Sequence, residues 1–124
     1  MSELIYKDEA FQIIGICMEV HRILGGGFLE IVYKDALEYE FRKKGIYYER
    51  EKQFDIQYKE IILPHKYYAD FTIGNEIILE VKAVNEIPDE FIKQTINYLA
   101  VSNYKLGLII NFGRDKLLYK RVVL

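Results

Sequence analysis

The sequence predicts a mixed α/β fold in which helices flank a central sheet, and three observations carry this prediction. Apolar residues recur at helical spacing before Gly45, the period changes to two after it, and a further helical segment separates two strands near the end. The expected element order is α-α-β-β-β-α-β-β, within a single domain spanning residues 1–124.

Two helices are expected before Gly45. The first occupies residues 4–24 and ends at Gly25-Gly26-Gly27, since glycine has weak helix propensity and accepts left-handed conformations. The second occupies residues 28–44. Their apolar stripes are Ile13, Ile16, Cys17, Val20 and Leu24 in the first, and Leu29, Val32, Tyr33, Ala36, Leu37 and Phe41 in the second.

Strands follow Gly45. Alternation of Phe54, Ile56 and Tyr58 predicts the first strand, and a tight turn at Gly74-Asn75 joins strands at residues 67–73 and 76–84. A third helix at 88–103 precedes strands at 106–112 and 116–123. Because residues 106–110 are almost entirely apolar, we expect a central strand there, parallel to 76–84 across the helical crossover.

Composition restricts the class of protein. Apolar residues make up 51% and charged residues 29%, which excludes a disordered chain. No apolar run approaches the roughly 20 residues of a membrane span, and Met1-Ser2-Glu3 does not begin a signal peptide, so we expect a cytoplasmic protein without membrane partners. The net charge of −2 counts against nucleic acid as a partner without excluding it.

Charged residues cluster around the Gly74-Asn75 turn. Glu80 and Lys82 share one face of their strand, and Asp70, ten positions before Glu80, comes near cross-strand register with it. Two carboxylates suit Mg²⁺ or Mn²⁺, and Lys82 would then hold the attacking water and stabilise developing negative charge. Taken alone, this spacing slightly favours a buried ion pair that only fixes the hairpin.

Other polar residues favour a site. Gln94 and Tyr98 are four positions apart and therefore share one face of the third helix, which follows directly from the strand that carries Glu80. Glu30 is a third carboxylate, at the start of the second helix, where helix capping is the alternative explanation. With these residues beside Asp70, a metal site becomes the better interpretation.

The series Asp70, Glu80-Val81-Lys82 and Gln94-x3-Tyr98 resembles the PD-(D/E)XK nuclease superfamily, and Gly27-Phe28-Leu29-Glu30-Ile31-Val32-Tyr33 resembles the signature of its GxxExxY family. The resemblance implies a restriction-endonuclease-like core. It also implies metal ligation by Asp70, Glu80, the Val81 carbonyl and Glu30, with Lys82 as the catalytic lysine and Gln94 as the motif glutamine. Ala69 stands where the superfamily name has proline.

The leading hypothesis is a Mg²⁺- or Mn²⁺-dependent nuclease that hydrolyses phosphodiester bonds of nucleic acid with a metal-activated water, with DNA favoured over RNA as the substrate. Tyr98, His21 and Tyr33 are candidates to contact the substrate or to support the ligands, although a lone histidine on an apolar flank is more often structural. The alternatives are a catalytically silent module that binds nucleic acid or protein, and a structural domain with a buried ion pair. Homodimerisation is compatible with so small a domain.

Overall fold

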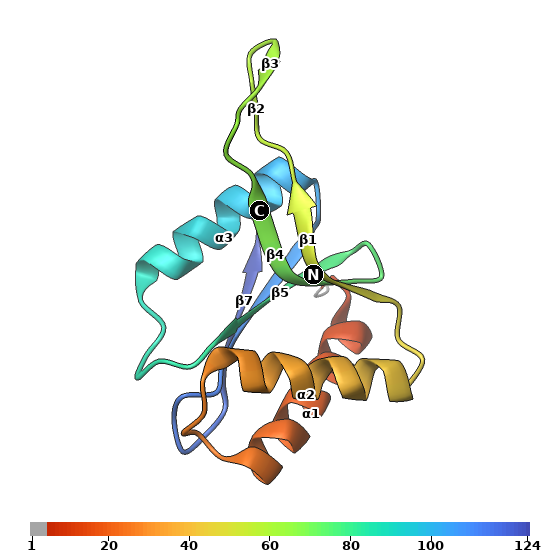
Figure 1. Ribbon diagram of the computed structural model, residues 1–124, viewed down its shortest axis with the longest axis vertical. Coiled ribbons are helices and arrows are strands. Elements are labelled where there is room, and N and C mark those ends of the chain that lie inside the picture. Colours follow the sequence, from red (N-terminus) through yellow and green to blue (C-terminus); the bar gives the residue numbers. More distant parts are fainter. Residues whose placement is uncertain (1–4) are drawn as a thin grey trace, which may run out of the picture.

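The computed structural model describes residues 5–124, and within this range it contains the three expected helices and seven strands (Figure 1). In chain order these are α1 (Lys7–Leu24), α2 (Glu30–Lys43), β1 (Tyr48–Phe54), β2 (Gln57–Tyr58), β3 (Ile61–Ile62), β4 (Tyr67–Ile73), β5 (Ile77–Lys82), α3 (Asp89–Ser102), β6 (Leu106–Asn111) and β7 (Leu118–Val123). Leu4, with which the first helix was expected to begin, lies outside the described residues.

Five strands form one mixed sheet in the order β1-β4-β5-β6-β7. Strands β5 and β6 are parallel, and the other neighbours are antiparallel. The parallel pair confirms the crossover predicted through the third helix. The short strands β2 and β3 form a separate hairpin that projects beyond the sheet (Figure 1).

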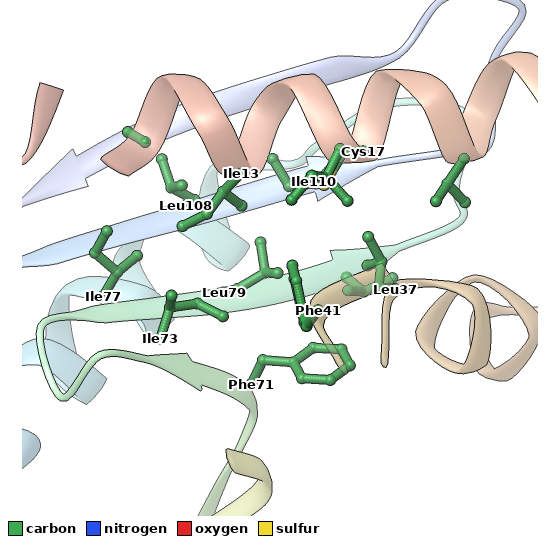
Figure 2. Packing of buried hydrophobic residues seen from close by; sticks show 14 of the residues in the cluster. Ile13, Cys17, Leu37, Phe41, Phe71, Ile73, Ile77, Leu79, Leu108 and Ile110 are labelled. Carbon is green, nitrogen blue, oxygen red and sulfur yellow. The ribbon is translucent and has the colours of Figure 1, made fainter. Parts of the chain in front are cut away.

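The two faces of the sheet are covered by different helices. Helices α1 and α2 pack on one face, where Ile13, Leu37, Phe71 and Leu79 belong to the larger apolar cluster (Figure 2). On the other face, α3 contributes Leu99 to a smaller cluster that also contains residues of β4, β5, β6 and β7. This layering confirms the restriction-endonuclease-like α/β arrangement.

The first strand differs from its prediction. The alternation of Phe54, Ile56 and Tyr58 placed it too late, because β1 begins at Tyr48 and ends at Phe54. The reason lies in its partner: β4 runs from Tyr67 to Ile73, and the antiparallel register pairs its two ends with Phe54 and Tyr48. Beyond Phe54 the chain leaves the sheet and forms the β2–β3 hairpin, which the expected element order did not include.

Among residues 5–124, no helix is both long enough and apolar enough to cross a membrane.

Candidate active site

Asp70 and Glu80 face each other where the β4–β5 ladder stops. The paired residues are Ile73 with Ile77, Thr72 with Ile78 and Phe71 with Leu79, and continuing this register places Asp70 opposite Glu80. Instead of a backbone pair, the Asp70 N–H donates to Glu80 Oε2 at 2.9 Å. The Val81 N–H donates to Asp70 Oδ2 at 2.8 Å. Each carboxylate therefore fixes the backbone of the opposite strand and is itself oriented.

At Asp70, strand β4 changes which of its side chains face each side of the sheet. Ala69 belongs to the cluster beneath α3, whereas Phe71 belongs to the cluster beneath α1 and α2. In a regular strand, residues two apart share a face. Asp70 thus sits at a local distortion, and its side chain is only 19% exposed.

Glu80 is a buried acid, with only 7% of its surface exposed. Burial, and after it the nearby charge of Asp70, raise the pKa of Glu80 to about 8 from its ordinary value of 4.5. The Asp70 N–H and the charges of Lys82 and Lys34 act in the opposite direction but offset only part of the shift. The two acids therefore lack full compensation by the surrounding cationic side chains, which is a condition that favours cation binding.

Lys34 and Glu51 join the acid pair, and sequence reasoning missed both. Lys34 on α2 donates through Nζ to Asp70 Oδ1 at 3.1 Å and also to Glu51. Burial alone would lower the pKa of Lys34, but the bonds and charges of these two carboxylates outweigh it, so the pKa lies above its ordinary value. A signal was present: residue 34 precedes Leu37 and Phe41 at helical spacing, on the face that is buried.

Lys82 extends from the end of β5 toward α3. Its Nζ lies 4.5 Å from the centre of the Phe91 ring, a cation–π contact. Gln94 follows Phe91 by three positions and precedes Tyr98 by four, which places it along the same edge of α3. The Gln94 side chain is exposed and makes no hydrogen bond within the described chain.

Tyr98 stacks on Tyr67, a residue of β4 that sequence reasoning treated only as apolar. The ring centroids are 3.4 Å apart. The Tyr67 hydroxyl is buried, and among the described residues it has no hydrogen-bond partner. Burial raises the pKa of Tyr67 strongly, and the charges of Glu80, Tyr98 and Asp70 add to the shift, so this phenol stays protonated near the acid pair.

Glu30 is the first residue of α2 and is half-buried. The structure brings Asp70, Glu80 and Lys82 together on neighbouring strands, but Glu30 does not complete a ligand cluster with the two acids. In the part of the chain that the structure describes, no group of three or more His, Cys, Asp or Glu side chains is arranged to hold a metal ion.

His21 and Tyr33 support the loops at one end of the sheet. His21 Nε2 donates to the Arg114 carbonyl at 2.7 Å, between α1 and the β6–β7 loop. The Tyr33 hydroxyl donates to the Gly25 carbonyl at 2.5 Å and accepts from the Phe28 N–H at 3.1 Å. Tyr33 therefore fixes the glycine turn that precedes Glu30, whereas His21 connects α1 to the β6–β7 loop.

Asn111 closes the same end of the sheet and was not singled out from the sequence. It lies beside Lys82 in the parallel register. Its side chain accepts from the N–H groups of Val84 and Gly113 at 3.0 Å each and donates to the Val84 carbonyl at 2.9 Å. Gly113 is required here, because a Cβ would lie 2.3 Å from the Val84 carbonyl oxygen. These contacts fix the segment that leaves Lys82.

The donor set fits a divalent cation that prefers oxygen. Asp70 and Glu80 supply two neighbouring, oriented carboxylates, and each retains lone pairs beyond the hydrogen bonds described. Magnesium commonly binds through one or two carboxylates and keeps several waters, so a third acidic ligand is not a requirement.

Comparisons with known proteins agree with this fold. Residues 7–122 match the family model described as the PD-(D/E)XK nuclease superfamily. No curated protein matches the chain. A solved structure, titled "Crystal structure of SSO0001", superposes with a TM-score of 0.60 at 18% identity. That match covers 95% of this chain but only 59% of the other, so it shows similarity of fold over part of a longer protein. The chain belongs to the PD-(D/E)XK nuclease superfamily.

Proposed function

We propose that this protein is a metal-dependent nuclease that hydrolyses phosphodiester bonds, with DNA as the preferred substrate over RNA. The observation that carries the proposal is the register of Asp70 with Glu80 beside Lys82, in a chain that belongs to a nuclease superfamily. We further propose that residues 1–124 act as one domain of the GxxExxY branch, on the segment from Gly27 to Tyr33.

Asp70 and Glu80 would hold Mg²⁺ or Mn²⁺, with the Val81 carbonyl as a third oxygen ligand. When bound, such a cation lowers the pKa of a coordinated water and stabilises negative charge on the phosphate. Val81 lies between the two side chains that carry charge on β5, and its N–H already fixes Asp70. The hydrogen bonds between the strands therefore hold the carboxylates in place before any ligand arrives.

Lys82 would supply positive charge to the reacting phosphate. Its ammonium group rests against the Phe91 ring, and a cation–π contact of this kind is worth only about 0.5–2 kcal/mol. A phosphate oxygen can therefore compete for the ammonium group. At this position Lys82 would stabilise negative charge on the phosphate and hold the attacking water.

Gln94 and Glu30 have proposed roles at the rim of the site. Gln94 is exposed along the edge of α3 between Phe91 and Tyr98, where its amide can donate to a phosphate oxygen. Glu30 would contribute through a bound water rather than as part of a three-acid cluster, because no such cluster exists in residues 5–124. Each assignment is testable by amide and carboxyl substitutions.

The decisive experiment measures cleavage of single-stranded and double-stranded DNA and RNA by purified protein with Mg²⁺ or Mn²⁺. Asp70→Asn, Glu80→Gln and Lys82→Met should each reduce cleavage at least about 100-fold, as expected for groups that act at the reacting phosphate. Asp115→Asn and Glu60→Gln remove exposed carboxylates and should leave cleavage unchanged. Cleavage that persists in all three site variants would exclude this assignment.

A silent binding module is the second candidate, and one observation favours it. Asp70 is already ion-paired with Lys34, so its charge is partly neutralised without a metal ion. Such a module would bind oligonucleotides or protein without hydrolysing any strand form. Fluorescence anisotropy with labelled oligonucleotides, run beside the cleavage assay, separates binding from turnover.

A further inference from the structure

Lys34 is a charged residue on the buried face of α2. Its side chain is 10% exposed, whereas its helical neighbours Tyr33, Leu37 and Phe41 on this face are fully buried. Burying an ammonium group is unfavourable unless it is paired and hydrogen-bonded. Both of its carboxylate partners lie on strands β1 and β4, so Lys34 links the helix to the edge of the sheet at the candidate site.

Glu51 reaches Lys34 through an unusual backbone conformation. The pairs Arg50 with Phe71 and Lys52 with Ala69 place Glu51 opposite Asp70, but the ladder omits this position. Glu51 has a φ of 55°, in the left-handed region. A residue other than glycine in this region costs of order 1–3 kcal/mol and persists where the surroundings fix it. The carboxylates of Glu51 and Asp70 thereby reach the same ammonium group.

The ammonium group occupies one oxygen of a proposed metal ligand. Asp70 Oδ2 is taken by the Val81 N–H, and Asp70 Oδ1 is taken by Lys34 Nζ at 3.1 Å. A divalent cation on Asp70 would bring two further positive charges close to that of Lys34. Because the cation and the Lys34 ammonium group would share one carboxylate, their positive charges would repel each other appreciably, even with strong solvent screening.

We infer that Lys34 is a positioning residue of the candidate metal site: held by Glu51, it is the counterion that orients Asp70 in the metal-free protein and competes with a divalent cation for this carboxylate. The inference rests on the proposed function only in that Asp70 binds a cation. Removing the ammonium group should therefore strengthen cation binding while destabilising the metal-free fold. If the role of Lys34 were purely structural, its removal would weaken cation binding as well as destabilise the metal-free fold.

The test compares Lys34→Met with wild type, Lys34→Arg and Lys43→Met. Lys43 lies on the same helix, is exposed and carries the same charge, so its replacement controls for net charge. After treatment with EDTA, Mn²⁺ is titrated by calorimetry, and the melting temperature is measured with and without Mn²⁺. Lys34→Met should bind Mn²⁺ about fivefold more tightly or better, by removing roughly one like charge, and should show a larger rise in melting temperature on adding Mn²⁺.

The control variants should bind Mn²⁺ within about twofold of wild type, since each retains an ammonium or guanidinium group beside Asp70. If Lys34→Met does not fold, Glu51→Gln serves instead. In this variant Asp70 is the only carboxylate paired with Lys34, and a negative charge near the site is lost. Mn²⁺ binding should therefore weaken about fivefold. Unchanged affinity in the variant that folds would overturn the inference, as would weaker binding by Lys34→Met.

The outcomes separate this inference from the proposed function. Wild type that binds Mn²⁺ and cleaves nucleic acid, together with Lys34→Met of unchanged affinity, overturns only the role of Lys34. Tighter binding by Lys34→Met without cleavage in any protein supports the role of Lys34 and overturns the proposed catalysis. Absence of Mn²⁺ binding by both wild type and Lys34→Met overturns both.

Discussion

The two halves of the β4–β5 hairpin have different tasks. Next to the turn, backbone hydrogen bonds connect the paired residues, and Phe71 and Leu79 are fully buried in the larger apolar cluster. At the open end the ladder stops, and the carboxylates of Asp70 and Glu80 bond to backbone N–H groups instead. One hairpin thus combines a half that supplies stability with a half that concentrates charge, and the first holds the second in register.

The largest effect expected in the turn half comes from Phe71→Ala. Phe71 packs edge-on against Phe41 at a centroid distance of 5.4 Å and is fully buried. Its truncation should lower the free energy of unfolding by about 3–5 kcal/mol, as measured by urea denaturation, because it leaves a cavity between α2 and the sheet.

The matched control is Phe11→Ala on α1, since Phe11 is 80% exposed. Its effect should stay within about 0.5 kcal/mol. Equal losses in the two variants would mean that the turn half is not where stability is concentrated.

An intermediate effect is expected from Glu80 at the open end, where its titration should make the melting temperature depend on pH when the protein is measured in EDTA. Because its pKa is about 8 when folded against an ordinary value of 4.5, the folded protein holds this proton more tightly than the unfolded chain does. The resulting stabilisation is full below about pH 4.5 and is lost as the pH rises to about 8. The melting temperature of wild type should therefore fall over this range relative to Glu80→Gln, whose amide does not titrate.

Glu60→Gln is the control for this comparison, because Glu60 is an exposed carboxylate in the β2–β3 turn. It should follow the wild-type profile. If Glu80→Gln follows it too, the open half does not bear an uncompensated charge.

The smallest effect is expected from Tyr67→Phe. The hydroxyl that this change removes is buried without a partner among the described residues, so the free energy of unfolding should stay unchanged or rise by less than about 1 kcal/mol. Tyr33→Phe removes a hydroxyl with two hydrogen bonds and should lose about 1–2 kcal/mol. Urea denaturation of both variants measures the contrast, and a larger loss for Tyr67→Phe would show that its hydroxyl is bonded after all.

Much of the fold could be predicted because its signals are local. Gly25-Gly26-Gly27 follows the first helix, Gly45 follows the second, and the turn at Gly74-Asn75 fixes the register of β4 with β5. Both turn residues adopt positive φ angles of 59°, which glycine and asparagine tolerate best. The register of Asp70 with Glu80 follows from that turn and from counting.

The rest of the site depends on tertiary contacts that the sequence pattern does not predict. Helical spacing with Leu37 and Phe41 places Lys34 on the buried face of α2, but its carboxylate partners depend on how α2 packs on the sheet. Nothing in the residue type of Glu51 signals a left-handed backbone. Tyr67 fits the apolar pattern of β4, so its unpaired hydroxyl emerges only from the packing. The position of β1 likewise depends on its partner strand rather than on its own alternation.

The turn between β4 and β5 has a consequence for protein engineering. Gly74, Asn75 and Glu76 separate the last paired residues, Ile73 and Ile77. Since side chains alternate along a strand, a loop longer or shorter by one residue would place an aliphatic neighbour of Glu80 opposite Asp70 and turn Glu80 to the other face. The length of this loop is therefore fixed by the chemistry at the far end of the hairpin. Insertions for labels or fusion partners are better placed at the tip of the β2–β3 hairpin, which projects beyond the five-stranded sheet (Figure 1).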